Sequence, residues 1–254
     1  MTLVAVDIGN SAFKAGWFSP TALAAEFPAT DVIWSCREEA PDASLTAFLH
    51  EHSLQWRVAS VNRTRQENLA AWVREHRPQD DYRLLTYREL PLTVEVEFPD
   101  RVGVDRLAAA VAGNALRSPS SPAIVVDAGS AITVDLVSAA GAFQGGAIYP
   151  GFRLSAEALF GGADLLPLTI LEPLREPPPV VGRNTDAAIK SGLFWGAVGA
   201  VRELVARTAE SVRPTPEVFV TGGDLRRLAE FIPGSRFAPN MVLSGIALAT
   251  RSGC

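Results

Sequence analysis

The sequence predicts an α/β protein made of two related halves, and two observations lead to this prediction. A short apolar run that ends in aspartate, one apolar residue and glycine occurs at residues 3–9 and again, about half a chain length later, at residues 124–129. Strand and helix patterns alternate after each copy, which is typical of parallel strands joined by helical crossovers. A chain of 254 residues has room for both halves, which we expect at 1–117 and 118–254.

The first half opens with apolar runs separated by turn residues such as Ser19-Pro20, the pattern of a three-stranded meander. A later stretch carries Leu69, Trp72 and Val73 at helical spacing, and an alanine-rich stretch predicts the last helix of this half. The expected strands are 2–7, 12–18, 22–27, 56–61, 84–85 and 92–96, and the expected helices are 44–52, 65–76 and 105–116.

The second half repeats this plan after the proline- and serine-rich break at 118–122. Five prolines between Pro167 and Pro179 exclude a helix or a central strand there and predict an extended loop. Asn184 or Thr185 is expected to cap the longest helix. The expected strands are 123–127, 131–138, 142–149 and 218–220, and the expected helices are one of about ten residues that ends near 161–162, then 185–210, 225–231 and 239–251.

The composition indicates a soluble globular protein that stays in the cytoplasm. A net charge of −5 and the lack of a basic stripe argue against a nucleic acid partner. We expect no membrane span and no signal peptide, because the apolar runs are short and the chain starts directly in a strand. The two cysteines, Cys36 and Cys254, are far apart in the sequence and predict neither a disulfide framework nor a metal site.

The turn after the first apolar run has the residues of a phosphate cradle. Gly9 lets a ligand approach the backbone, Asn10 and Ser11 offer donors, and Lys14 adds a cation. One such turn alone is equally typical of an ordinary hairpin. The second copy favours the functional interpretation, since two facing turns can hold one nucleoside triphosphate.

Each turn also follows an aspartate. Asp7 and Asp127 would supply carboxylate oxygens to Mg²⁺ or to a monovalent cation. The chain has no P-loop string, so this is a different kind of nucleotide site. His50, His52 and His76 have no carboxylate or cysteine cluster near them and are expected to be structural or surface residues.

A third motif, Gly103-Val104-Asp105-Arg106, opens the alanine-rich helix. A structural interpretation places Asp105 at the positive end of the helix dipole with Arg106 in solvent. A functional interpretation makes Asp105 the acceptor of a hydroxyl proton and Arg106 the partner of a carboxylate or phosphoryl group. Phosphoryl transfer requires mainly positioning and charge neutralisation, so such a set can suffice.

In their order along the chain, these motifs resemble the type III pantothenate kinase family. The resemblance runs from residue 7 to Thr185 and includes the phrase at 240–245, so it covers nearly the whole chain. Each motif alone is only moderately specific, but four in order are a strong match. The other residues that carry the resemblance are Ser130, Thr133 and Asp135 after the second turn and the glycine-rich phrase at 145–151.

This resemblance implies two duplicated actin-like (ribonuclease H-like) lobes, with mixed sheets flanked by helices. It implies ATP-dependent phosphorylation of pantothenate to 4'-phosphopantothenate, the first step of coenzyme A biosynthesis. The implied cofactors are ATP, Mg²⁺ and a monovalent cation, K⁺ or NH₄⁺, and the implied partner is a second copy of the chain in a homodimer.

The resemblance also assigns roles to individual residues. Asp105 would be the catalytic proton acceptor, Asp127 the ligand of the monovalent cation and Asp7 a candidate Mg²⁺ ligand. Pantothenate would contact Gly103, Val104, Asp105, Arg106 and, across the dimer interface, Thr185. ATP would contact Asp7, Ile8, Gly9, Asn10, Ser11, Ala12, Phe13, Lys14 and Ser130.

The chain departs from the family pattern in two places. Val96 stands where the family often has a substrate-contacting tyrosine, which affects the expected pantothenate contacts. Ser130 replaces a commoner threonine and keeps the hydroxyl. The tryptophans and the Phe194-Trp195 pair are expected in the core or at an interface, and residues 221–224 fit either a further nucleotide loop or a plain strand-to-helix junction.

Two other functions remain open on the sequence. The chain could keep the nucleotide grip and act as a non-catalytic regulatory protein, an alternative to which Val96 lends weight. It could also phosphorylate another small hydroxy acid or a sugar, although the motif at 103–106 argues against a sugar.

Overall fold

The computed structural model describes residues 2–30, 33–41, 43–49, 53–169, 176–223 and 228–253. Within the chain, two compact units form: one comprises Met1–Arg117, Gly141–Gln144 and Asn240–Cys254, and the other comprises Ser118–Ala140 and Gly145–Pro239. His50, His52, Asp224 and Cys254, and parts of the predicted helices at 44–52 and 225–231, lie outside the described residues.

The first unit contains a five-stranded mixed sheet with the strand order β3-β2-β1-β4-β5. Strands β1, β2 and β3 are antiparallel neighbours, and β4 and β5 add to the edge of β1 as parallel strands. The strands are β1 (Thr2–Ile8), β2 (Phe13–Phe18), β3 (Ile33–Cys36), β4 (Leu54–Ser60) and β5 (Asp81–Leu84).

The strand predicted at 22–27 is wrong. Residues Pro20–Ala24 form the short helix α1, in which the Ser19 side chain accepts a hydrogen bond from the Ala22 N–H and Pro20 occupies the first helical turn. A serine cap followed by proline is a helix-start signal, which the apolar pattern concealed. The third strand of the meander is β3, farther along the chain.

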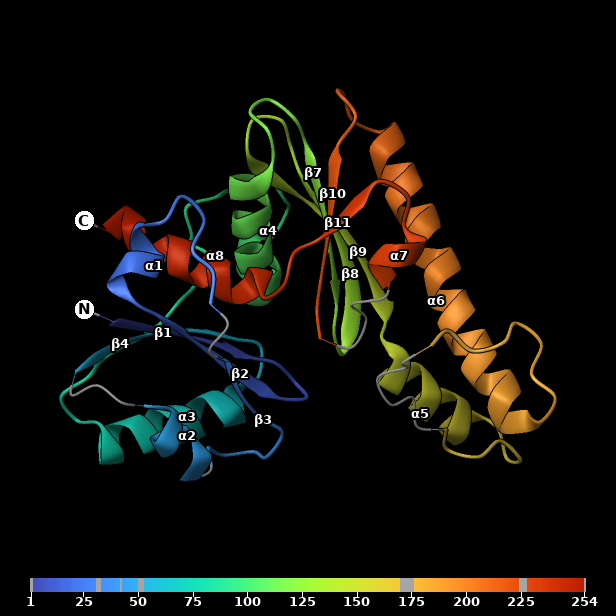
Figure 1. Cartoon of the computed structure of the whole chain (residues 1–254), viewed down its shortest axis with the longest axis horizontal. Helices are drawn as coiled ribbons and strands as arrows, with labels where there is room; N and C mark the ends of the chain where they lie inside the picture. Colours follow the sequence, from blue (N-terminus) through green and yellow to red (C-terminus); the bar gives the residue numbers. More distant parts are fainter. Residues whose placement is uncertain are drawn as a thin grey trace. The chain divides into compact units, whose positions relative to one another are not determined.

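Helices cover both faces of this sheet (Figure 1). Helices α2 (Ala43–Phe48) and α3 (Arg63–His76) lie on one face, where they bury a core that includes Val6, Trp56 and Leu69. Helices α4 (Val104–Leu116) and α8 (Met241–Ala249) lie on the other side, and α8 packs against both α4 and β1. The C-terminal helix thus belongs to the first unit. A short 3₁₀ turn, η1 (Pro99–Arg101), precedes α4, and another, η2 (Thr250–Gly253), follows α8.

The second unit repeats the topology of the first. Its strands follow the order β11-β10-β7-β8-β9, in which β7 and β8 form the antiparallel hairpin and β10 and β11 are parallel to β7. The two sheets therefore correspond strand by strand, with β7 in the place of β1 and β10 in the place of β4. This confirms the predicted duplicated α/β fold. The strands are β7 (Ala123–Ala128), β8 (Ala131–Val137), β9 (Ala142–Pro150), β10 (Glu217–Thr221) and β11 (Ser235–Phe237).

The long helix α6 (Thr185–Glu210) covers one face of the second sheet. The Asn184 side chain caps it by accepting a hydrogen bond from the Ala187 N–H at 2.8 Å, as the sequence predicts. Val126, Val134 and Val220 point to this helix from three neighbouring strands. The remaining elements are α5 (Phe152–Gly162), α7 (Leu228–Phe231) and the two-residue strand β6 (Thr93–Val94), which pairs with Ala142 and Phe143 at the start of β9.

Gly245 on α8 permits close contact with α4, and this contact yields a stability prediction. A Cβ built at Gly245 would lie 1.8 Å from the Ala108 carbonyl oxygen, so Gly245→Ala must push the helices apart. We expect the free energy of unfolding to fall by about 1–3 kcal/mol in urea denaturation. The matched control is Gly192→Ala on α6, where a Cβ meets nothing within 4 Å and helix propensity adds up to about 1 kcal/mol. Equal stability of the two variants would contradict the packing argument.

Candidate active site

The first predicted phosphate turn is the loop that joins β1 to β2. The Gly9 N–H donates to the Ala12 carbonyl at 3.0 Å, and Asp7 lies directly opposite Lys14 in the hairpin. A Cβ at Gly9 would meet only the Ala12 oxygen, at 3.6 Å, which is ordinary contact. Local packing therefore does not require glycine here, and its lack of a side chain leaves the backbone of the turn open.

The second turn has the same construction in the second unit. The Gly129 N–H donates to the Ala131 carbonyl at 3.0 Å, and a Cβ at Gly129 would meet only that oxygen, at 3.7 Å. Ser130 lies at the tip, and its carbonyl accepts a hydrogen bond from the Gly151 N–H at 3.1 Å. Both turns therefore carry a glycine for which local packing provides no reason.

Two other glycines hold the second turn in place. A Cβ at Gly151 would lie 2.4 Å from the Gly129 carbonyl oxygen, and a Cβ at Gly222 would lie 2.2 Å from the Ala128 carbonyl oxygen. Gly222 also has a φ of +108°, which side chains of L-residues rarely adopt. The glycine-rich phrase at 145–151 and the turn after β10 thus support the second turn by close backbone packing.

The acceptor motif begins helix α4, and Gly103 is the cap residue. The half-buried Asp105 lies in the first helical turn, and its Oδ1 accepts the Arg106 backbone N–H at 2.8 Å. A Cβ at Gly103 would lie 2.5 Å from that Oδ1, so glycine makes room for the Asp105 side chain. Burial raises the pKa of the Asp105 carboxyl, while the hydrogen bond from Arg106 and its positive charge act in the opposite direction.

The structure brings the first turn and the acceptor motif together inside the first unit. Val61, which follows β4, donates its N–H to the Ile8 carbonyl at 3.0 Å. The same residue borders the acceptor motif, because a Cβ at Gly103 would lie 3.5 Å from Val61 Cγ1. The helix start that carries Asp105 and the turn predicted to bind phosphate are therefore neighbours in space, although far apart in the sequence.

The guanidinium of Arg106 lies over the ring of Phe143, 5.6 Å from its centroid. Phe143 is fully buried at the start of β9, so it offers Arg106 a fixed aromatic surface. The sequence pattern did not indicate a role for this phenylalanine in the site. Its place just before the glycine-rich phrase at 145–151 is the one signal that could have indicated it. Val96, which replaces the expected tyrosine, is partly exposed, and Phe98 beside it is 46% exposed and carries the Arg101 guanidinium over its ring.

Thr185 is exposed at the first residue of α6. Gly182 packs against this first turn, where a Cβ would lie 2.2 Å from the Ala188 nitrogen. Beside Thr185, the Asp186 carboxylate pairs with Lys190 at 2.7 Å and accepts the Thr169 hydroxyl at 3.1 Å. Thr185 thus lies at a capped helix start with its side chain exposed.

The described residues offer few side chains that could bind a metal ion. Among the residues that the structure describes, no group of three or more His, Cys, Asp or Glu side chains could hold a metal ion. The Thr133 hydroxyl, however, is buried without a hydrogen-bond partner, and Thr133 lies directly opposite Asp127. One carboxylate beside an orphaned neutral oxygen fits a monovalent cation. Mg²⁺ usually keeps several waters and binds through one or two carboxylates plus substrate phosphates, which Asp7 could supplement.

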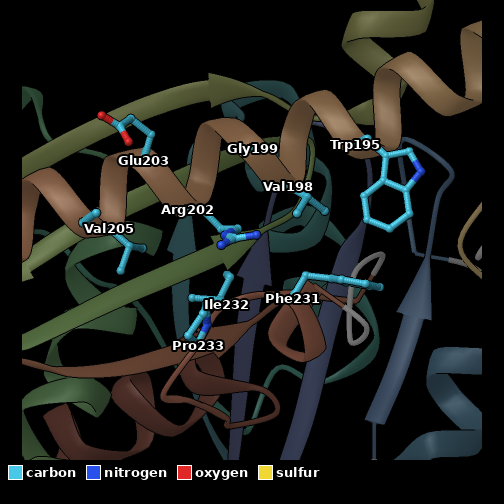
Figure 2. Close-up of a pocket in the computed structure, with 10 residues that line it drawn as sticks. Trp195, Val198, Gly199, Arg202, Glu203, Val205, Phe231, Ile232 and Pro233 are labelled. Carbon is cyan, nitrogen blue, oxygen red and sulfur yellow. The ribbon is translucent and has the colours of Figure 1, made fainter. Parts of the chain in front are cut away.

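A separate pocket of about 640 Å³ lies on the second unit, between α6 and the segment after α7 (Figure 2). None of the predicted site residues lines it. Trp195 and Phe231 meet edge to face at one end with ring centroids 5.2 Å apart, and Arg202 and Ile232 line it farther along. Trp195 donates its ring N–H to the Pro178 carbonyl, while Phe194 is buried in the core, as predicted for this pair.

Two duplicated units, each with a glycine turn after an aspartate near the end of its central strand, define the actin-like fold. In agreement, the chain superposes on a Sinorhizobium meliloti protein described as a candidate 2-dehydro-3-deoxygalactonokinase, with a TM-score of 0.53 over 98% of both chains. It also superposes on a Campylobacter jejuni protein described as a candidate Baf family transcriptional activator, with a TM-score of 0.60 over 98% of both chains. Sequence identities of 12% and 18% limit these likenesses to the fold.

Within that fold class, the family of the chain is defined by its sequence. The model of the type III pantothenate kinase family matches residues 3–207. A type III pantothenate kinase of Rhodopirellula baltica is 36% identical, over 92% of both chains. One of Rubrobacter xylanophilus is 35% identical, over 87% of this chain and 86% of its own. The chain belongs to the type III pantothenate kinase family.

The raised pKa of Asp105 makes a prediction about stability that is independent of turnover. A carboxyl with a higher pKa in the folded state retains its proton where the unfolded chain has lost it, so stability falls as pH rises from about 4 through the folded pKa. Asp105→Asn keeps the acceptor oxygen and removes this dependence. We expect the variant to be more stable than wild type at pH 7 and to show a flatter pH profile of unfolding in that window. An identical profile for both proteins would show that burial does not perturb Asp105.

Proposed function

We propose that this protein transfers the γ-phosphoryl group of ATP to the primary hydroxyl of pantothenate, which starts coenzyme A biosynthesis. The observation that carries the proposal is the acceptor motif of the family at the start of α4, with Asp105 half-buried and held by the Arg106 N–H. Membership in the family supports both the reaction and the substrate.

In this proposal Asp105 orients the substrate hydroxyl and accepts its proton. A raised pKa suits this role, because a general base works best when its pKa approaches the working pH. Arg106 binds the carboxylate of pantothenate, and its place over Phe143 fixes the guanidinium in one orientation. Gly103 and Val104 contact the substrate through the backbone at the start of the helix.

In this proposal, the first glycine turn binds phosphates of ATP. Residues 7–14 form the first cradle, with Lys14 as its cation, and Ser130 in the second turn is a further ATP contact. Mg²⁺ carried by the nucleotide, with Asp7 as a ligand, and a monovalent cation at Asp127 would offset the phosphate charge. The orphaned Thr133 hydroxyl beside Asp127 supports the second ion.

The catalytic role of Asp105 predicts a loss of turnover without a loss of folding. Asp105→Asn should lower kcat by about 10²–10⁴-fold with little change in the KM for ATP. The matched control is Asp100→Asn, which alters an exposed carboxylate in the 3₁₀ turn just before α4 and should leave kcat unchanged. ADP release measured by a coupled assay gives both constants. Wild-type turnover by Asp105→Asn would remove the base from the mechanism.

A single assay separates the proposed function from the two alternatives. ADP release is measured with and without pantothenate, in K⁺ and in Na⁺ buffer, and the phosphorylated product is identified by mass. We expect release to require pantothenate and to be faster in K⁺. ATP binding without turnover on any acceptor would favour a regulatory protein, and turnover only with another acceptor would favour a kinase of a different hydroxy acid or sugar.

We also propose that the enzyme is a homodimer that works in the cytoplasm. Eight exposed apolar side chains lie on α5 and on the chain segments that flank it in the second unit, and we propose that they form one apolar surface. Its members are Ile148, Leu154, Leu159, Phe160, Leu165, Leu168, Val180 and Val181, and Leu165 is 90% exposed. Two of its members, Val180 and Val181, lie a few residues before Thr185 in the sequence. This supports the proposal that Thr185 contacts pantothenate bound by the partner subunit. The free, buried thiol of Cys36 suits a reducing compartment, and no helix among the described residues is long and apolar enough to cross a membrane.

The apolar surface predicts that a charge within it weakens the dimer. Leu165→Glu should raise the dimer dissociation constant at least 100-fold, because a carboxylate would lose its hydration on association. Light scattering across a concentration series measures the constant. The control is Leu84→Glu on β5 of the first unit, which is 38% exposed and lies outside this surface. A dimer that tolerates Leu165→Glu as well as it tolerates the control would place the interface elsewhere.

A further inference from the structure

Three oxygen-bearing side chains form a row across neighbouring strands of the second unit. In the sheet register, Asp127 on β7 lies opposite Thr133 on β8 and beside Thr221 on β10. Residues paired in this way project from the same face of a sheet. The neighbouring residues Val126, Val134 and Val220 face α6, so the row occupies the face that α6 does not cover.

The hydroxyl of Thr133 has no hydrogen-bond partner. Among the described side chains, the hydroxyls of Thr133 and Tyr82 are the buried polar groups that lack a hydrogen-bond partner. Thr133 is 9% exposed. Leaving a buried hydroxyl unpaired is unfavourable, so such an atom in a native protein requires an explanation. Its place directly opposite Asp127 provides one, since a cation held by that carboxylate would have this oxygen at hand.

The equivalent row in the first unit has a different composition. There Asp7 lies opposite Lys14 on β2 and beside Ala59 on β4. The first hairpin therefore faces its aspartate with a cation that belongs to the chain. In the second hairpin, the neutral hydroxyl of Thr133 stands at the register position of Lys14. The hydroxyl of Thr221 stands where the first unit has the methyl group of Ala59.

We propose that the monovalent cation at Asp127 does in the second hairpin what the Lys14 ammonium does in the first, and that Thr133 and Thr221 are its neutral oxygen ligands. This inference rests on the proposed cation at Asp127 and extends it to two residues with no assigned role. Each hairpin then has a cation at the register position opposite its aspartate. Neutral oxygens suit a weakly hydrated ion of charge +1 better than Mg²⁺, which demands octahedral geometry and retains its waters. An ammonium ion resembles the lysine head group directly, so we expect the site to accept NH₄⁺ as well as K⁺.

The test measures thermal unfolding as KCl replaces choline chloride at constant ionic strength. Wild-type protein should gain roughly 2–4 °C in Tm at saturating K⁺, and the titration yields an apparent K⁺ affinity. Thr133→Val keeps the shape, removes the oxygen and should weaken that affinity at least tenfold, whereas Thr133→Ser should retain it. The control Thr208→Val removes a hydroxyl that bonds within α6 and should respond to K⁺ as wild type does.

A fourth variant tests the analogy between the two hairpins. Thr133→Lys supplies the cation from the chain, so its Tm and its activity should no longer depend on K⁺. The failures are distinguishable. A wild-type protein whose Tm and turnover ignore K⁺ would refute the cation at Asp127 itself. If wild-type protein responds to K⁺ and Thr133→Val responds equally, only the role of Thr133 is refuted. Should Thr133→Val not fold, an unchanged K⁺ response of Thr133→Lys would refute that role instead.

Discussion

In both units, the proposed chemistry depends on a central strand whose last apolar residues fix its register. Val4, Val6 and Ile8 of β1 pack against α2 and α3, and Ile124, Val126 and Ala128 of β7 pack against α6. Because side chains alternate along a strand, the residue between the last two apolar positions must project from the opposite face. That residue is an aspartate each time. A slip of one residue would bury the carboxylate in the core, so hydrophobic packing fixes where the charge stands.

Glycine has two separate uses around these aspartates. Gly151 and Gly222 are required by the fold, since any side chain there would collide with the backbone of the second turn. Gly9 and Gly129 meet no such restriction, and both lie in the turns themselves. Removing a side chain where packing does not demand it leaves backbone donors accessible, which is the property that a phosphate site needs. Glycine thus permits close backbone packing at Gly151 and Gly222, and it leaves the backbone of the turns open at Gly9 and Gly129.

Much of the fold could be predicted because its signals are local. The repeated run before Asp7 and Asp127, the cap at Asn184 and the helix start at Gly103 each depend on residues that are close in sequence. The error at 22–27 has a local cause too, because the Ser19-Pro20 helix start was outweighed by the apolar pattern. The role of Phe143 under Arg106 could not be predicted, since the two residues lie on different elements, α4 and β9, and meet only in the tertiary structure.

Local patterns alone establish that the chain has two related halves, each with an aspartate before a glycine turn, and a carboxylate at a helix start between them. Alternation, capping and turn chemistry act over a few residues, so they can be recognised without a structure. Long-range packing establishes the rest. Helix α8 returns to the first unit, where Gly245 meets Ala108, and β10 pairs with the β7–β8 hairpin, which places Thr221 in one row with Asp127 and Thr133. Such neighbours depend on strand order and register, which the whole sheet decides and no short segment encodes.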